Sequence, residues 1–243
     1  MVTQYLSEDG IANERFCTYH EEKAQGGWGL IITENYTIAR GVGAYSELPG
    51  LYSDEQIASH KELVRRVHAA GAKIACQIYN AGRQINYEAT GVYPVGPSAI
   101  PYGEGYLVPK ILTTKDIQEI VKQFAYTAAR VQAAGFDAVE IHGAHGYLLH
   151  SFVSPLSNKR TDKYGGDIIG RSRFSVEVVK AVRAAVGDDF PIFYRMSAAE
   201  YEEGGLDITE AQILAMQLEE AGVDLIHVSQ GGTPRRINVV LPS

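Results

Sequence analysis

The 243-residue sequence has few cysteines, a single tryptophan and no excess of positive charge. Cys17 and Cys76 are too few and too far apart for a disulfide framework or a structural zinc site, so we expect a reducing cytoplasm. The net charge is −7 and no stretch gathers enough Lys or Arg to neutralise a run of phosphates, which argues against a nucleic-acid partner. The chain begins without a basic leader or a long apolar run, so neither a signal peptide nor a membrane span is expected.

What the sequence does contain is a repeated alternation of helical patterns with short apolar runs. Hydrophobic residues make up 45% of the chain, enough for a sizeable core. Five runs are too apolar to have a solvated face, which predicts a parallel sheet covered by helices. The expected helices span 12–25, 53–71, 114–134, 173–186 and 209–221, and the strands that follow them span 29–33, 72–78, 136–141, 191–195 and 224–228.

Both a barrel and an open doubly wound sheet fit this alternation, but the glycines and polar residues favour the barrel. No G-x-G-x-x-G follows a strand, which weakens the dinucleotide-binding open sheet. Three helices end on an Ala-Gly pair, as repeated barrel units do. Polar residues collect just after the strands, where barrel enzymes build their sites. We therefore predict an α/β fold of the TIM (β/α)8 barrel type, with residues 1–243 as one domain; the polar residues are Glu34, Asn35, Gln77, His142, His145, Arg195 and Ser229.

The segment 141–150 holds the densest group of chemically useful side chains. His142 and His145 are three residues apart, with Tyr147 two further on, at the mouth of a predicted strand. Two imidazoles and a phenol offer two hydrogen-bond donors for a substrate oxygen and one proton source for a neighbouring carbon. His150 is expected to be structural. The same histidine pair could hold zinc in a metal-dependent hydrolase, but the sequence shows no third ligand at a matching position, so no metal site is predicted.

Several segments of the sequence resemble the Old Yellow Enzyme family. The longest is 142–166, HGAHGYLLHSFVSPLSNKRTDKYGG, which is followed by RSRF at 171–174. Shorter matches extend the resemblance over nearly the whole chain. They are CQIYNAGR at 76–83, GPSAIP at 96–101, LTT at 112–114, RMS at 195–197 and EGGLDIT at 203–209. Within the family, the bacterial branch of NADH oxidases, enoate reductases and dienoyl-CoA reductases is the most similar.

The resemblance implies a barrel with FMN at its top and a role for each matching residue. His142 and His145 would hold the activating oxygen of the substrate, and Tyr147 would supply the proton. Gln77 would bind the pyrimidine edge of the flavin, and Arg195 would lie near its N1 and O2 atoms, where a guanidinium stabilises the charge of reduced flavin. FMN-binding positions implied more weakly are Thr3, near the flavin O4, and Asn35, through its backbone.

The resemblance also predicts that the barrel is incomplete in this sequence. The first strand should precede Thr3, and nothing after Gly232 resembles the last two βα units, whose loops hold the FMN phosphate in this family. We therefore expect a fragment of a longer product. In the enoate and dienoyl-CoA reductase branch, an iron–sulfur cluster and FAD would lie in further C-terminal domains.

The predicted function is an NAD(P)H-dependent ene-reductase that passes hydride through FMN to an enone, enoate or enoyl thioester. The expected partner is this small molecule, and a homo-oligomer is left open. Besides the metal-dependent hydrolase, an inactive truncated barrel is an alternative. The sequence does not distinguish NADH from NADPH as the reductant.

Overall fold

The computed structural model describes residue 7 and residues 9–232, and their centre is a five-stranded parallel sheet. The strand order in the sheet follows the order along the chain, so each strand lies beside the one before it. The strands are β1 (Leu30–Thr37), β2 (Lys73–Tyr79), β5 (Ala138–Gly143), β6 (Ile192–Ser197) and β7 (Leu225–Ser229). Each of the five predicted strands is present, and every one extends further at its carboxyl end than the apolar run suggested.

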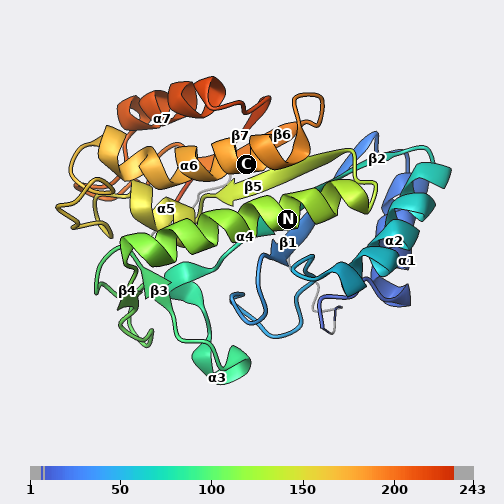
Figure 1. Ribbon diagram of the computed structural model, residues 1–243, viewed down its shortest axis with the longest axis horizontal. Helices are drawn as coiled ribbons and strands as arrows, with labels where there is room; N and C mark the ends of the chain where they lie inside the picture. The colour runs from blue at the N-terminus through green and yellow to red at the C-terminus, as the bar shows by residue number, and fades with distance from the viewer. Residues whose placement is uncertain (1–6, 8, 233–243) are drawn as a thin grey trace, which may run out of the picture.

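One long helix precedes each of these strands: α1 (Glu14–Gln25), α2 (Ile57–Ala69), α4 (Thr114–Ala133), α6 (Ile168–Val186) and α7 (Ile208–Glu220). Figure 1 shows α4 and α6 side by side across the sheet, with α1 and α2 at one end and α7 at the other. A doubly wound sheet reverses its strand order and carries helices on both faces. Here the order never reverses, so the structure has the arrangement of consecutive barrel units.

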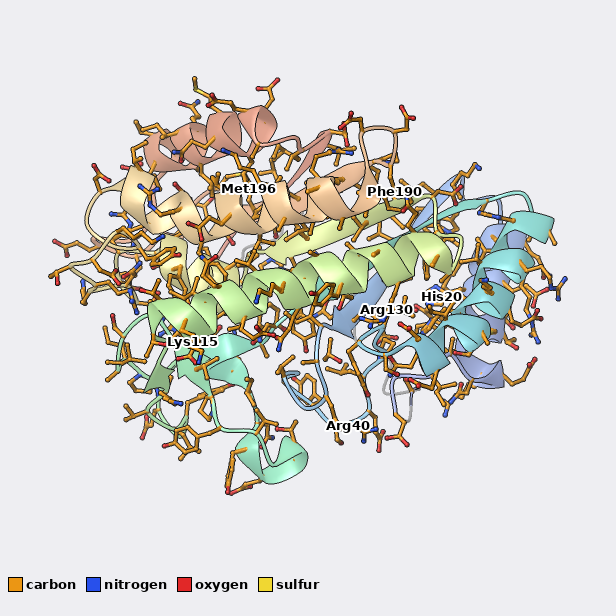
Figure 2. All side chains as sticks on the ribbon, in the orientation of Figure 1. His20, Arg40, Lys115, Arg130, Phe190 and Met196 are labelled. Atoms are coloured by element: carbon orange, nitrogen blue, oxygen red, sulfur yellow. The ribbon has the colours of Figure 1, made fainter. Side chains whose placement is uncertain are left out.

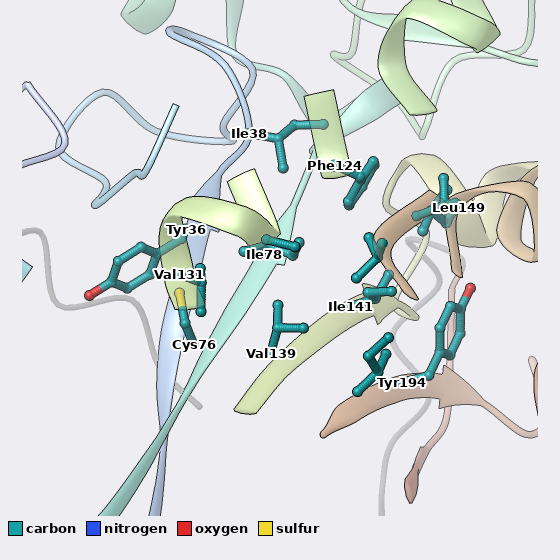
Figure 3. Packing of buried hydrophobic residues seen from close by; sticks show 14 of the residues in the cluster. Tyr36, Ile38, Cys76, Ile78, Phe124, Val131, Val139, Ile141, Leu149 and Tyr194 are labelled. Atoms are coloured by element: carbon teal, nitrogen blue, oxygen red, sulfur yellow. The ribbon is translucent and has the colours of Figure 1, made fainter. Parts of the chain in front are cut away.

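The two faces of the sheet differ in chemistry because side chains alternate along a strand. One face packs against the helices: Cys76, Ile78, Val139 and Ile141 are fully buried there beside residues of α4 (Figure 3). The opposite face, called the inner face below, carries polar side chains instead; they are Gln77, Glu140, His142, Arg195 and His227. The helices therefore form an outer layer, and the chemistry lies on the inner face.

Capping side chains set several helix starts, and the largest difference from the predicted ranges is at α6. Thr113 caps α4: its hydroxyl accepts from the Asp116 backbone N–H, and the Asp116 carboxylate accepts from the Thr113 backbone N–H. Asp167 caps α6, which therefore begins at Ile168 instead of residue 173. Figure 2 labels Lys115 and Arg130 near the two ends of α4, where Arg130 forms a 2.6 Å ion pair with Asp54.

The two long connections contain short elements that the sequence did not predict. Between β2 and α4 lie a 3-10 helix (Gly82–Gln84), α3 (Tyr87–Thr90) and a two-stranded sheet of β3 (Val95–Gly96) and β4 (Lys110–Ile111), seen at the bottom of Figure 1. After β5 comes α5 (Leu148–Val153), all six residues of which are buried. Such pieces are too short to show a hydrophobic period. Across the described ranges, no helix combines the length and apolarity needed to cross a membrane.

An aspartate just before a strand joins neighbouring barrel units at two places. Asp137 precedes β5 and accepts from the Ile74 backbone at 2.8 Å, while Asp224 precedes β7 and accepts from the Ile192 backbone at 2.7 Å. Burial would raise the pKa of the Asp137 carboxyl, but hydrogen bonds from Lys73, His68 and Ile74 hold it below its ordinary value. The ionised carboxylate therefore stabilises the folded state.

Replacing Asp137 by Asn is expected to lower the free energy of unfolding by about 1–2 kcal/mol at neutral pH, because the amide keeps the shape but loses the charge. A depressed pKa gives stability that is present above the ordinary Asp value and is lost as pH falls through the folded pKa. Urea unfolding of both proteins should thus show a constant difference near neutrality that shrinks below about pH 4. A difference independent of pH would contradict this assignment.

Candidate functional site

The carboxyl ends of the strands bring the predicted site residues onto one rim of the inner face. Backbone pairing sets Asn35 beside Gln77 on β1 and β2, and His142 beside Arg195 on β5 and β6. Tyr147 lies directly before α5, in the connection that leaves the end of β5. The predicted site side chains therefore share one end of the sheet. They are the amide of Gln77, the imidazoles of His142 and His145, the phenol of Tyr147 and the guanidinium of Arg195. Thr3 lies outside the described residues.

His142, His145 and Tyr147 form a compact cluster of rings. The ring centroid of His142 is 5.1 Å from that of His145 and 5.0 Å from that of Tyr147, both in edge-to-face geometry. Tyr79 adds a fourth ring, 5.0 Å from Tyr147. Edge-to-face contacts restrain rings without closing their polar edges to a ligand. The cluster is thus held in place by packing.

Hydrogen bonds fix both imidazoles. The His142 Nδ1 atom accepts from the Ala144 backbone at 3.2 Å, so the proton of the neutral ring is on Nε2, where it can be donated to a ligand. The His145 Nε2 atom lies 2.6 Å from the Ser229 hydroxyl, which ties this ring to the end of β7. His145 has a left-handed backbone with φ of 60°, and its amide donates to the Ser197 hydroxyl. Two further strands therefore position the second imidazole.

His150, expected to be structural, supports the turn that carries His145. Its Nδ1 atom accepts from the Gly146 backbone at 2.8 Å, and its ring is buried. Gly146 itself has φ of 75°. Successive left-handed residues are costly for most side chains and need such supporting bonds. The structure therefore gives His150 the role of holding the loop between β5 and α5.

Burial keeps the three rings in their uncharged forms. It lowers the pKa of His142 well below its usual range, with further lowering from the charges of His145 and Arg195. It also lowers the pKa of His145 to about 4, again with Arg195 contributing. For Tyr147, burial raises the pKa to about 12. Near neutral pH the imidazoles are neutral donors and the phenol keeps its proton.

An NMR titration should show this directly. The ring protons of His142 and His145 are expected to keep constant chemical shifts from about pH 8 to about pH 5, because protonation is disfavoured by burial. A midpoint near the ordinary histidine value for either site ring would show that the cluster is solvated.

Gln77 and Arg195 present buried polar atoms that have no hydrogen-bond partner among the described residues. These atoms are the Gln77 Oε1, an acceptor, and the Arg195 Nε, a donor. Buried polar atoms in proteins are nearly always paired, so an orphaned pair on the inner face suggests a missing ligand. The pyrimidine edge of a flavin carries a donor at N3 and acceptors at O2 and N1. The unpaired acceptor of Gln77 and the unpaired donor of Arg195 therefore fit the hydrogen-bonding atoms at this edge of FMN.

A cavity of roughly 390 Å³ opens beside Tyr147. Its wall is largely aromatic, with Tyr45, Tyr87 and Tyr106 joining the phenol of Tyr147. The long connection between β2 and α4 supplies most of the lining. A small molecule in this cavity would lie against the predicted proton donor.

Sequence reasoning missed Glu140 and His227, which also lie on the inner face. Glu140 is fully buried on β5 and joins Gln77 on β2 to His227 on β7. Glu140 lies in the predicted strand 136–141, two residues before His142. His227 lies in the predicted strand 224–228. The alternation of inward and outward side chains, counted back from His142, was the signal that would have found Glu140.

The structure offers no support for the metal-dependent hydrolase. Within residues 9–232, no three His, Cys, Asp or Glu side chains gather so that they could hold a metal ion. The histidine pair instead uses one nitrogen of each ring for internal hydrogen bonds.

Comparison with known proteins agrees with this geometry. The family model described as NADH:flavin oxidoreductase / NADH oxidase matches residues 1–237. The chain belongs to this family. The resemblance to Old Yellow Enzyme proteins is thereby confirmed.

Among similar proteins, the NADH oxidase of Thermoanaerobacter brockii is 43% identical over 234 residues, which cover 95% of this chain and 36% of that protein. The NADPH dehydrogenase of Listeria innocua is 42% identical over 230 residues, covering 93% of this chain and 65% of the relative. The solved structure of morphinone reductase superposes with a TM-score of 0.84 at 32% identity, covering 93% of this chain and 65% of the other.

This chain thus spans less than two thirds of the length of these relatives. The described part contains five consecutive barrel strands, and the matching enzymes are barrels of this family. The predicted incomplete TIM barrel is therefore confirmed.

Proposed function

We propose that the protein carrying this chain is an ene-reductase, which reduces an activated carbon–carbon double bond of an enone, enoate or enoyl thioester. The observation that carries the proposal is the shared rim: the cluster of His142, His145 and Tyr147 lies at the same end of the sheet as Gln77 and Arg195. A flavin held by the second pair would place a substrate above it within reach of the first. Asn35 and Thr3 are proposed as additional FMN contacts.

FMN, when bound, would supply the hydride that it receives from NADH or NADPH. The side chains of this chain supply the remaining chemistry. The Nε2–H of His142 and the ring of His145 bind and polarise the activating oxygen of the substrate, which stabilises negative charge that develops there. Tyr147 holds its proton at neutral pH and donates it to the carbon next to the activating group. Arg195 would help to hold FMN and would supply fixed positive charge to stabilise its reduced form.

The cavity next to Tyr147 favours a substrate with a flat, uncharged part. Among the residues that the structure describes, its lining includes Glu88 and no Lys or Arg side chain. A free carboxylate in this cavity would meet like charge without a compensating cation. Among the three substrate classes, the enone therefore fits this wall better than the free enoate.

The other parts of the proposal concern the whole protein. The relatives are named both NADH oxidase and NADPH dehydrogenase, so either nicotinamide is a candidate donor. An iron–sulfur cluster and FAD would belong to domains of a longer protein. A cytoplasmic location agrees with Cys17 and Cys76, which are both buried and unpaired.

The chain by itself lacks the units expected to hold the FMN phosphate, so we expect it to bind FMN weakly or not at all. Titrating the full-length protein that carries this chain with FMN therefore tests the flavin site. We expect flavin fluorescence to be quenched on binding, and Arg195→Ala to weaken binding by about tenfold or more, since a hydrogen bond from a charged group is worth about 1.5–3 kcal/mol. Arg173→Ala, on the outer surface of α6, is the matched control. Absence of quenching by the wild-type protein would favour the inactive truncated barrel.

A further inference from the structure

The carboxylate of Glu140 is a buried ionisable group on the inner face to which no role has yet been given. It lies in the middle of β5 with no exposed surface. One oxygen accepts from the Gln77 Nε2 atom at 2.5 Å, and the other lies 2.8 Å from the His227 Nδ1 atom. Burying a carboxylate is expensive unless its hydrogen bonds compensate for the lost water. A residue retained at such cost invites a functional explanation.

The two contacts join three strands across the concave side of the sheet. Gln77 pairs with Glu140 on the adjacent strands β2 and β5, but β6 separates β5 from β7. Adjacent strands are about 4.8 Å apart, so side chains two strands apart meet only where the sheet curves toward them. Glu140 thus occupies the floor of the inner face, below the rim that carries His142 and Arg195.

The contact with Glu140 decides which way the Gln77 amide points. The Gln77 Nε2 amino group donates to one oxygen of Glu140, so the amino side of the amide faces the carboxyl group. The Gln77 carbonyl oxygen is then turned away from Glu140, and in the described part of the chain this buried atom has no partner. The Gln77 backbone is held separately, since its N–H donates to the Thr33 hydroxyl at 3.1 Å.

We propose that Glu140 is a positioning residue for flavin recognition, which acts through Gln77 by fixing the amide with its oxygen toward the N3–H of the isoalloxazine ring. This inference rests on the proposed function. Without the carboxylate, the amide could turn and present its amino group to N3–H, so that two donors would face each other. The His227 ring contacts the other oxygen of Glu140, and this contact keeps the carboxylate from turning toward a different partner.

The decisive variant is Glu140→Gln, which keeps the size but introduces an amino group that competes for the Gln77 oxygen. We expect the dissociation constant of FMN to rise by about tenfold or more, which corresponds to losing one well-formed buried hydrogen bond. In a Gln77→Ala background, the same Glu140→Gln change should have little further effect, because Glu140 acts through Gln77. Equal fold-changes in both backgrounds would overturn the inference.

Glu177→Gln is the matched control. Glu177 also accepts from a glutamine amide, that of Gln118 at 2.7 Å, but it lies on α6 outside the inner face. Its replacement should leave FMN affinity unchanged. If Glu140→Gln fails to fold, as judged by circular dichroism, Glu140→Asp serves instead: it keeps a carboxylate but withdraws it by one methylene, and should give an intermediate affinity.

A measurement without flavin separates failure of this inference from failure of the proposed function. In the flavin-free protein, the side-chain amide of Gln77 should give a shifted, slowly exchanging NMR signal that moves in Glu140→Gln and not in Glu177→Gln. An unmoved signal would show that Glu140 does not hold the Gln77 amide, even if FMN binds. If the wild-type protein shows the contact between Glu140 and the Gln77 amide but binds no FMN, the proposed function is refuted. The role of this contact in flavin recognition is then refuted as well.

Discussion

Replacing Tyr147 by Phe is expected to slow reoxidation of the reduced flavin by an enone by about 100-fold or more, the usual contribution of a general acid. Reduction of the flavin by NAD(P)H should be nearly unchanged, because that step needs no proton from Tyr147. Phe keeps the ring contacts with Tyr79 and His142, so only the hydroxyl is lost. Stopped-flow absorbance separates the two half-reactions.

Tyr194→Phe provides the control for this experiment. The Tyr194 hydroxyl is buried and donates to the Ser175 hydroxyl at 2.8 Å, on the helix-facing side of β6. Its loss should reduce stability and leave both half-reactions alone. Reoxidation of Tyr147→Phe at the wild-type rate would remove Tyr147 from the role of proton donor.

The second large effect is expected when His142 and His145 are both replaced by Ala. Binding of a phenolate ligand or an enone should weaken by about 100-fold or more, since two hydrogen bonds to a charged or polarised oxygen are lost at about 1.5–3 kcal/mol each. The measurement is the absorbance change of the flavin on titration with a substituted phenol. FMN affinity should fall much less than phenol affinity.

A third histidine makes this result specific. His60 is a fully buried residue of α2, and its Nε2 atom lies within hydrogen-bond distance of the backbone oxygens of Gly10 and Gly50. Replacing His60 should destabilise the protein without changing phenol affinity in the folded fraction. If the double variant binds phenol as tightly as the wild-type protein, the histidine pair is structural.

The strands and the rim were predictable because each depends on a local pattern. Branched apolar runs identified all five barrel strands. The polar residues at the ends of these runs, among them Gln77, His142 and Arg195, were predicted to lie at one end of the sheet. Parallel strands in consecutive units point the same way, so residues at their carboxyl ends meet whatever the loops do. Helix α6 begins at Ile168 rather than at the predicted residue 173, because Asp167 caps it by accepting from the Gly170 backbone.

Other parts of the site depend on contacts between distant segments, which no local pattern contains. The Glu140 contact with His227 needs the curvature of the sheet, and the bond from His145 to Ser229 joins residues 84 positions apart. Tyr87 and Tyr106, which line the cavity next to Tyr147, come from a connection whose helices and strands are too short to be recognised in the sequence. These features arise from tertiary packing alone.

The left-handed backbone at His145 limits the side chains that this position can accept. Most residues lose about 1 kcal/mol or more in that conformation, whereas His, Asn and Asp tolerate it better than others. Of these three, an ionised Asp has no proton to offer a substrate oxygen. The geometry of one turn therefore narrows the possible hydrogen-bond donors at this corner to histidine and asparagine, whatever substrate the enzyme takes.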